Sequence, residues 1–134
     1  MNFREGDKTE KYWESKLSKK EYDILRRGST ELPYTGKFNN HFEDGTYVCK
    51  GCGEPLYESK SKFESGCGWP SFDECIENSI EYKKDYNIGV LRIEILCSTC
   101  GGHQGHVFND GPTKTNKRYC VNSASIDFIP KKNK

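Results

Sequence analysis

The segment Val90-Leu91-Arg92-Ile93-Glu94-Ile95-Leu96-Cys97-Ser98-Thr99-Cys100 joins the clearest strand of the sequence to a pair of cysteines. Within residues 90–96, apolar and charged residues alternate from Leu91 to Ile95, and alternation with a period of two predicts a β-strand. Leu91, Ile93 and Ile95 then share one face of that strand, and the charged residues between them lie on the other. The two cysteines that follow are separated by two residues, a spacing that is typical of metal ligands.

A second pair, Cys49-Lys50-Gly51-Cys52, has the same spacing, and 44 residues lie between Cys52 and Cys97. Together with Cys97 and Cys100 it supplies the four thiolates that a structural zinc ion prefers in a closed tetrahedral site. Glycine follows each pair and gives the backbone the freedom that a tight turn requires. Because the separation exceeds that of a compact zinc finger, we expect one zinc ion to clip two hairpins of a larger domain.

Two redox-active disulfides are the alternative interpretation of these pairs. A thioredoxin-like motif opens a helix after a buried strand, and neither pair does so. We therefore favour structural zinc.

The rest of the chain divides into a helical start and a β-rich body. Ser18 and Glu21 have the spacing of a capping box, which predicts a helix from Ser18 to Gly28. An earlier helical turn is expected within residues 9–16, with Tyr12 and Trp13 as apolar anchors. Weaker strands are predicted at residues 46–48, 56–57, 80–82, 106–108, 118–121 and 126–128, and a turn at 70–72.

Composition restricts the class of protein. The 134 residues, 33% of them apolar, predict a single domain with a modest core, and we expect residues 1–8 and 130–134 to fray. With 21 basic and 20 acidic residues the net charge is +1, which gives no reason to expect binding to nucleic acid or to a membrane surface. No segment has the form of a signal peptide or the length of a membrane span. We therefore expect a cytoplasmic protein, in which seven cysteines indicate metal binding and catalysis rather than a disulfide scaffold.

Cys120 lies outside both cysteine pairs, in Arg118-Tyr119-Cys120-Val121-Asn122-Ser123-Ala124-Ser125. An arginine precedes it by two residues, and His103 and His106 lie upstream. Nearby cations lower the pKa of a thiol, and the resulting thiolate is a nucleophile. Free cysteine is also among the most buried residue types, so this pattern alone leaves two interpretations open, a nucleophile and a small buried side chain.

Taken together, these segments resemble the B-type methionine sulfoxide reductases over nearly the whole chain. The resemblance rests on both cysteine pairs, on residues 63–72 (FESGCGWPSF), on His103-Gln104-Gly105-His106-Val107-Phe108, on Asp110-Gly111-Pro112 and on residues 118–125. It implies a mainly β fold of two antiparallel sheets, tent-like or barrel-like, with short N-terminal helices and a zinc clip. It also implies reduction of the R epimer of methionine sulfoxide, mainly in peptides and proteins, as protein repair under oxidative stress. Gln104 and Leu32 stand where the family commonly has leucine and arginine.

The resemblance assigns chemical roles around Cys120, the implied nucleophile. A sulfoxide sulfur is electrophilic only when its oxygen is protonated or hydrogen-bonded, and His103 and His106, which titrate near neutrality, are the implied donors. Asn122 and Arg118 are each two residues from Cys120, so on a strand they share its face, where Asn122 can orient the reacting groups and the Arg118 cation favours the thiolate. The implied substrate-binding residues are Trp69, whose apolar face suits the methyl group, Arg118, Phe108 and Asp110.

The product of the attack requires a second thiol. Oxidised to a sulfenic acid, Cys120 condenses with a nearby cysteine to form a disulfide. Cys67, in a glycine-flanked segment, is the implied resolving residue, and thioredoxin then reduces the disulfide. Cys75 remains as a non-essential thiol, with a second resolving role as the less favoured alternative.

We expect a monomer that acts on peptides and proteins with oxidised methionine. The competing class is a zinc-ribbon interaction module without catalysis. Such a module would need a basic surface with interleaved aromatic residues, and the charge balance argues against it.

Overall fold

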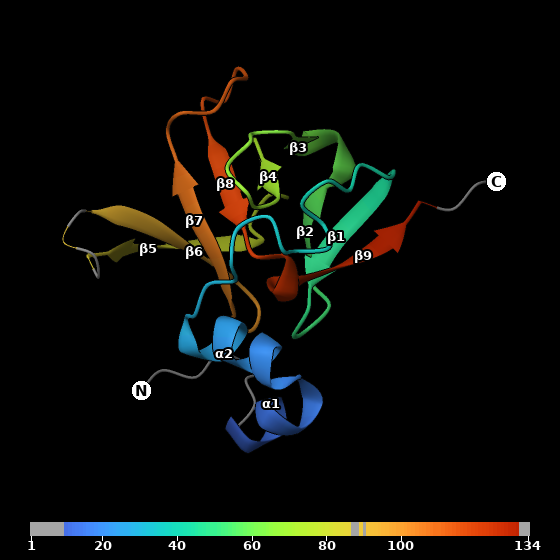
Figure 1. Cartoon of the computed structure of the whole chain (residues 1–134), viewed down its shortest axis with the longest axis vertical. Coiled ribbons are helices and arrows are strands. Elements are labelled where there is room, and N and C mark those ends of the chain that lie inside the picture. The colour runs from blue at the N-terminus through green and yellow to red at the C-terminus, as the bar shows by residue number, and fades with distance from the viewer. Residues whose placement is uncertain (1–9, 87–88, 90, 132–134) are drawn as a thin grey trace.

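The computed structural model describes residues 10–86, 89 and 91–131, and it shows two antiparallel β-sheets beside a pair of short helices (Figure 1). The small sheet has the strand order β2-β1-β9 and the large sheet the order β3-β4-β8-β7-β6-β5. The prediction of a mainly β fold with two antiparallel sheets and N-terminal helices is confirmed. The strands are β1 (Gly45–Cys49), β2 (Pro55–Glu58), β3 (Lys62–Phe63), β4 (Ser71–Phe72), β5 (Ile80–Asp85), β6 (Arg92–Cys97), β7 (His103–Phe108), β8 (Arg118–Val121) and β9 (Ile126–Pro130).

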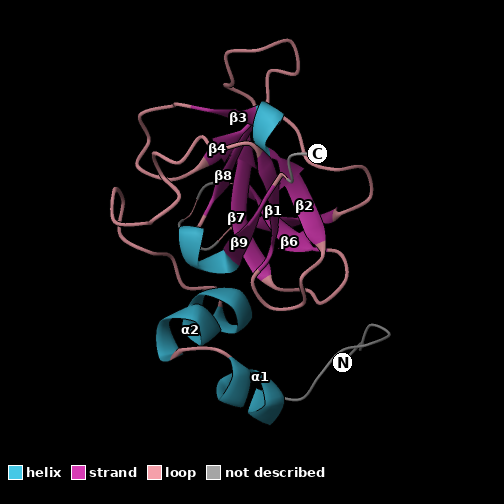
Figure 2. Ribbon diagram, turned by 90° about the vertical axis from the view of Figure 1, so that its right-hand side faces the viewer, coloured by secondary structure: helices cyan, strands magenta, loops and turns pink. Residues whose placement is uncertain are grey.

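The two helices, α1 (Glu10–Lys16) and α2 (Lys19–Arg27), lie together at one end of the molecule (Figure 2). The capping box at the start of α2 is confirmed, because Ser18 Oγ accepts the Glu21 N–H at 3.1 Å and the Glu21 carboxylate accepts the Ser18 N–H at 3.0 Å. Gly28 ends the helix with φ 76°, as predicted. Only one predicted aromatic anchor of α1 is buried, since Trp13 is 2% exposed and Tyr12 39%.

Most strands lie where alternation predicts them, with differences at their boundaries. Leu91 precedes β6 and is 52% exposed, so it does not share the buried face of Ile95; Val90 lies outside the described residues. The expected turn at residues 70–72 is wrong for Ser71 and Phe72, which form β4. Together with β3, β4 was not predictable from periodicity, because two residues are too few to show alternation.

The C-terminal strand runs further than expected. Pro130, placed among the fraying residues, ends β9, and the Lys131 N–H donates to the Asp44 carbonyl at 2.9 Å. Residues 1–9 and 132–134 lie outside the described part of the chain. Two short 3₁₀ turns, η1 (Ser59–Ser61) and η2 (Ser123–Ser125), complete the elements. None of the helices in the described ranges has the length and apolar content that crossing a membrane requires.

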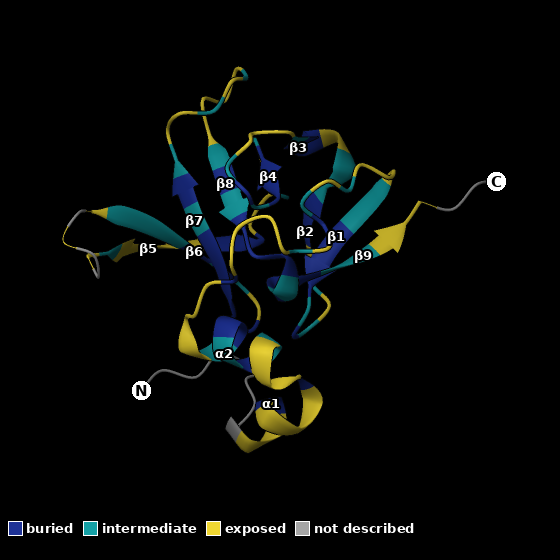
Figure 3. Cartoon of the chain, viewed as in Figure 1, coloured by how far each residue is buried: buried dark blue, intermediate teal, exposed yellow. Residues whose placement is uncertain are grey.

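An aromatic core joins the two sheets. Tyr47 and Tyr57 from the small sheet and Phe72 from the large sheet are all fully buried. The rings of Tyr57 and Phe72 are stacked with centroids 4.4 Å apart, and Tyr47 meets Phe72 edge-on at 5.2 Å. Buried residues lie on both sheets and on α2 (Figure 3). Because side chains alternate along a strand, every second residue of the large sheet points away from this core, to the opposite face.

Candidate active site and metal centre

The two cysteine pairs form one cluster at the ends of two hairpins. Cys49 ends β1, Cys97 ends β6, and Cys52 and Cys100 lie in the turns that follow. Cys49 Sγ lies 3.6 Å from Cys100 Sγ, and Cys52 Sγ lies 3.6 Å from Cys97 Sγ. All four sulfurs lie within 4.8 Å of one another. The clip between two hairpins that the spacing predicts is therefore present in the geometry.

The two turns have the same construction. In the first, the Gly53 N–H donates to the Cys49 carbonyl, and in the second the Gly101 N–H donates to the Cys97 carbonyl, both at 2.8 Å. Gly53 has φ 83° and Gly101 φ 77°, values that other residues adopt only with strain. Glycine after each cysteine pair thus closes the turn that aims two sulfurs at one point.

The four sulfurs fit a tetrahedral metal ion. A Zn–S distance of about 2.3 Å places the ligands of a tetrahedron about 3.8 Å apart, close to the observed separations. The hydrogen bond with Cys100 is the main cause that raises the pKa of Cys49 and of Cys97, and burial adds to the rise. A divalent cation is the group that would allow all four to ionise.

The N-terminal helices pack on this cluster. The Arg26 guanidinium donates to the Cys100 carbonyl at 2.9 Å and lies 4.8 Å from the centre of the Trp13 ring. The Lys16 ammonium group donates to the Gly51 carbonyl. The cluster therefore joins both sheets and both helices.

A row of polar side chains crosses the large sheet on the face turned away from the core. In register, Ser71 on β4 pairs with Cys120 on β8, Cys120 with His106 on β7, and His106 with Glu94 on β6. Residues directly opposite in an antiparallel sheet point to the same face. The strand pairing thus places Cys120 between a hydroxyl and an imidazole.

Gly105 allows β7 and β8 to approach closely beside Cys120. A methyl group on Gly105 would lie 2.0 Å from the Cys120 carbonyl oxygen, a distance at which the backbone must shift. No side chain other than hydrogen fits between the two strands at this position.

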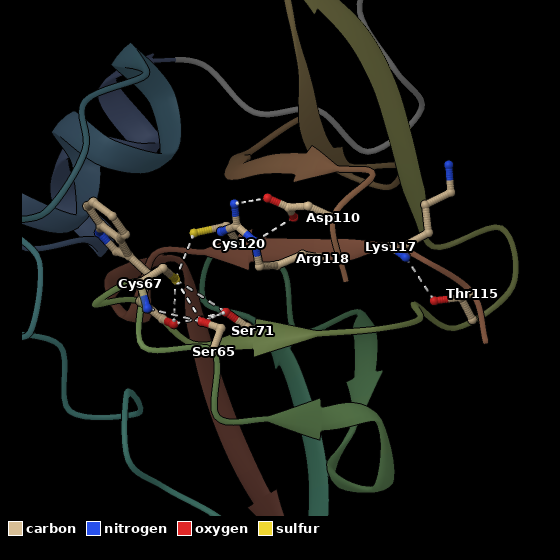
Figure 4. A network of polar contacts seen from close by, with 9 residues as sticks. Ser65, Cys67, Ser71, Asp110, Thr115, Lys117, Arg118 and Cys120 are labelled. Carbon is tan, nitrogen blue, oxygen red and sulfur yellow. Dashed lines mark hydrogen bonds and ion pairs between the residues drawn. The ribbon is translucent and has the colours of Figure 1, made fainter. Parts of the chain in front are cut away.

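Cys67 contacts Cys120 from the loop between β3 and β4, with the two Sγ atoms 3.6 Å apart (Figure 4). Ser65 Oγ donates to Cys67 Sγ at 3.0 Å, and Ser71 Oγ lies 3.4 Å from the same sulfur. The two cysteines, 53 residues apart in sequence, are therefore held in non-bonded contact.

The pKa values of the Cys67 and Cys120 thiols are shifted in opposite directions. The hydrogen bond with Cys120 is the main cause that lowers the pKa of Cys67, and the hydroxyls of Ser65 and Ser71 add to it. The pKa of the Cys120 thiol is raised, first by Cys67 and then by burial, although Arg118 opposes the rise. The sequence predicts a lowered pKa for Cys120, and the difference arises because its nearest neighbour is another sulfur rather than a cation.

Both cysteines line a cavity of about 250 Å³. This volume is below the roughly 300–1,000 Å³ of sites for drug-sized ligands and suits a single side chain. The predicted site residues in its wall are Cys67, Trp69, His106, Phe108, Arg118, Cys120 and Asn122, and the wall also contains Thr30, Arg92, Gly105 and Val121.

The two histidines lie at different depths. His106 lines the cavity, and its Nε2 lies 2.8 Å from Asp85 Oδ2; burial is the main cause that lowers its pKa, and Asp85 opposes the shift. His103 is 5% exposed, is not part of the cavity wall, and places Nδ1 2.6 Å from Glu94 Oε2. The His103 hydrogen bond lowers the pKa of Glu94. Only His106 therefore reaches the space beside Cys120 in this arrangement.

Arg118 is held by two groups. Its Nε and Nη2 donate to the two carboxylate oxygens of Asp110 at 2.8 and 3.1 Å, and its guanidinium lies 4.5 Å from the centre of the Phe108 ring. Asp110 does not line the cavity, so it reaches the site through Arg118. This bidentate ion pair with Asp110 keeps the Arg118 guanidinium beside Cys120.

Asn122 follows β8 rather than continuing it. Its Oδ1 accepts the Glu31 N–H at 3.0 Å, and its Nδ2 donates to the Gln104 carbonyl at 3.2 Å. The expected projection of its amide beside the thiolate is therefore replaced by a bridge between two backbone segments. Asn122 still contributes to the cavity wall.

Glu31 is a site residue that sequence reasoning missed. Its carboxylate accepts the N–H groups of Ser123 and Ala124 at 2.8 and 3.1 Å, and its carbonyl accepts the Trp69 indole N–H at 3.1 Å. It thereby ties the segment after Cys120 to the segment after Cys67. No local pattern could reveal this role, because the two backbone partners of the carboxylate lie 92 and 93 residues away.

Gln104, one of the departures from the family pattern, is fully buried. Its Nε2 donates to the Ser125 carbonyl at 3.1 Å, and its Oε1 lies 3.4 Å from the Tyr57 hydroxyl. A polar side chain is tolerated at this core position because both ends of the amide have partners.

Cys75 lies on the other side of the sheet from Cys120. Its Sγ is 3.9 Å from the hydroxyl of Tyr119, which precedes Cys120 in β8 and so points to the opposite face. The geometry therefore does not favour a second resolving role for Cys75.

Comparisons with known proteins agree with this arrangement. The model of the SelR domain matches residues 17–130. The peptide methionine sulfoxide reductase MsrB of Teredinibacter turnerae is 50% identical over 127 residues, which cover 94% of each chain. The protein of the same name from Leptospira interrogans is 48% identical over 129 residues, which cover 96% of this chain and 98% of that one.

Among solved structures, the Mis18 "Yippee-like" domain is similar with a TM-score of 0.53 and 19% identity, and the match covers 68% of this chain and 100% of that one. At this identity the likeness shows the fold alone. The SelR match spans most of the chain, and the relatives align along nearly their whole length. The chain therefore belongs to the SelR domain family, together with the B-type peptide methionine sulfoxide reductases.

Proposed function

We propose that the chain reduces methionine (R)-sulfoxide in peptides and proteins, with Cys120 as the nucleophile, Cys67 as the resolving thiol and thioredoxin as the reductant. The observation that carries the proposal is the 3.6 Å contact between the two Sγ atoms in the wall of one cavity. A disulfide needs a separation of about 2.05 Å, so an approach of roughly 1.5 Å joins them. Family membership supports the substrate and its epimer.

The reaction needs no group beyond substrate, protons and the two cysteines until the enzyme is recycled. The Cys120 thiolate attacks the sulfoxide, a proton is added to the oxygen, and the S–O bond of the substrate breaks. Methionine is released with its sulfur reduced by two electrons, and Cys120 is left as a sulfenic acid. The Cys67 thiol then displaces water to form the disulfide, which a dithiol protein reduces by exchange.

The cavity wall supplies the surroundings for these steps. Arg118, fixed by Asp110, stabilises negative charge on Cys120, and His106 lies beside it in register. Trp69 and Phe108 offer apolar surface to the methyl group and side chain of methionine. The wall thus combines an acid, a cation and apolar contacts around one sulfur.

We further propose that the four-cysteine cluster holds zinc with a structural role. When bound, the ion crosslinks the β1–β2 and β6–β7 hairpins, and a closed set of four sulfurs leaves no position for substrate.

A coupled assay with thioredoxin, thioredoxin reductase and each epimer of a methionine sulfoxide peptide tests the proposal. We expect turnover with the R epimer only, and one Cys67–Cys120 disulfide per chain after a single turnover without reductant, detected by peptide mapping. Equal rates with the S epimer would contradict the substrate assignment. Turnover without that disulfide would contradict the resolving role.

A further inference from the structure

Asp85, at the end of β5, contacts two residues of the cavity wall with one oxygen. Its Oδ2 accepts from His106 Nε2 at 2.8 Å and from Arg92 Nη2 at 3.2 Å. The Asp85 side chain is 9% exposed and that of His106 is 12% exposed. Nothing in the local sequence marks Asp85, because its partners lie on β6 and β7.

The contact fixes the protonation pattern of the imidazole. A carboxylate can only accept, so the ring nitrogen that faces Asp85 carries a hydrogen. The other nitrogen, Nδ1, has no hydrogen-bond partner among the described residues, and His106 lines the cavity. A neutral ring held in this way offers a lone pair at Nδ1, and a protonated ring offers an N–H.

The proposed reaction requires the second of these states. The sulfoxide oxygen is an acceptor, and it becomes a leaving oxygen only when a donor supplies a proton. In the cavity, His106 is the titratable imidazole beside Cys120, because His103 is not part of the wall. The group that supports the charged ring therefore governs the first chemical step.

We propose that Asp85 is a positioning residue of the reaction, which holds His106 by Nε2 and supports the protonated ring that donates from Nδ1 to the sulfoxide oxygen. The inference rests on the proposed function and adds a residue to it. In the step, the proton moves from Nδ1 to the oxygen, which leaves the methionine sulfur and is bonded as hydroxyl to the Cys120 sulfur. Methionine sulfur gains two electrons, the Cys120 sulfur loses two, and the neutral ring regains its proton from water.

The charges around His106 make Asp85 the main support of the protonated ring. The titratable and charged groups that face the ring are Asp85 from β5, Arg92 and Glu94 from β6, His103 from β7 and Cys120 from β8. Burial, Arg92 and His103 all lower the pKa of His106, and the hydrogen bond that the ring donates to Asp85 raises it. Removing the Asp85 charge should therefore lower this pKa further.

The test is Asp85→Asn in the full chain, with two independent measurements. Nitrogen-15 NMR of the ring nitrogens reports the tautomer and pKa of His106, and His→Gln variants assign the signals of the three histidines. The single-turnover rate of sulfoxide reduction, measured against pH, reports the reaction. The rate should fall as pH rises through the pKa of His106, because the protonated ring is the donor.

We expect the wild-type ring to carry its hydrogen at Nε2. In Asp85→Asn the His106 pKa should fall, the alkaline limb of the rate profile should move to lower pH, and the rate at neutral pH should drop about 10- to 100-fold, part of the roughly 10²- to 10⁴-fold worth of an acid catalyst. Asp85→Glu, which keeps the charge, should restore the profile in part. Glu81→Gln is the matched control, because it makes the same chemical change at an exposed position of the same strand.

Suppose that the wild type reduces sulfoxide and that the Asp85→Asn protein folds. An unchanged His106 pKa and an unchanged pH profile in that variant would then overturn the role of Asp85. If the asparagine variant does not fold, the wild-type spectrum decides, because a neutral ring with its hydrogen at Nδ1 contradicts the proposed contact. A wild-type chain that reduces no sulfoxide would instead overturn the proposed function, and that result is separate from the ring titration.

Discussion

The four-cysteine cluster and the Cys67–Cys120 pair both bring sulfur atoms to 3.6 Å from one another, and they differ in what holds the sulfurs. In the cluster, each pair is fixed by a hydrogen-bonded turn, and helices cover the outside. In the other pair, one sulfur belongs to a central strand of the large sheet and its partner to a loop beside a cavity.

The difference shows that the distance between two sulfurs does not determine their chemistry. Four sulfurs directed to one point from rigid turns form a closed ligand set, which suits a structural ion. Two sulfurs with access to a cavity have one neighbour each and space for a reactant. Number, rigidity and access therefore distinguish the four clustered cysteines from the Cys67–Cys120 pair.

The largest expected effect is the loss of sulfoxide reduction in Cys120→Ser, which changes one member of the Cys67–Cys120 pair. A serine hydroxyl without a general base is a poor nucleophile, so one equivalent of enzyme should release no methionine from the R sulfoxide. The free energy of unfolding should stay within about 1 kcal/mol of the wild-type value, because the change is nearly isosteric. Cys75→Ser is the matched control, since it makes the same change on the other face of β8 and should leave the single turnover intact. Methionine released by Cys120→Ser would place the nucleophile elsewhere.

The second prediction concerns the cluster, through Cys97→Ser. Loss of one ligand should release the metal and destabilise the fold by more than about 4 kcal/mol, because the proposed ion joins both hairpins and a structural zinc contributes on the order of 10 kcal/mol in small domains. Metal analysis and calorimetry measure the two effects. Cys67→Ser should retain one ion per chain. A wild-type protein with full thermal stability after chelation would remove the structural role from the cluster.

The smallest effect on the first chemical step is expected for Cys67→Ser. In this variant, the pH dependence of Cys120 reactivity tests how the two cysteines of the pair affect each other. Since Cys67 is the main cause that raises the pKa of Cys120, its removal should lower that pKa. Alkylation of Cys120 by iodoacetamide, followed by peptide mapping, should then proceed at lower pH than in the wild type. One equivalent of sulfoxide should still be reduced, but thioredoxin-supported turnover should collapse. Normal recycling in this variant would assign the resolving role to another thiol.

Features encoded within a few neighbouring residues could be predicted from the sequence. The capping box of α2 spans four residues, and each cysteine pair with its glycine spans five. The alternation in residues 91–95 identifies β6 because burial of one face imposes a period of two. These signals are local, so no knowledge of the partner segment is required.

Features set by strand pairing could not be predicted in this way. Periodicity places Arg92 and Glu94 on one face of β6, but only the pairing with β5 and β7 shows that this face carries the candidate site. The same holds for Gly105, whose lack of a side chain matters only because β8 lies against it. Glu31 lies outside the strands and was equally unpredictable, since its carboxylate accepts hydrogen bonds from residues more than 90 positions away.

The packing of α2 on the cluster has a consequence for synthesis of the chain. Arg26 and the Cys100 carbonyl that it contacts are 74 residues apart, and a ribosome that adds about 5–20 residues per second needs roughly 4–15 s to make that length. During this time the apolar side chains of Tyr22 and Leu25 have no sheet to cover them. Cys49 and Cys52 also lack Cys97 and Cys100, the other two members of the four-cysteine cluster. The nascent protein therefore passes through an interval with an uncovered helix and two unpaired thiols, during which it is exposed to aggregation and to oxidation.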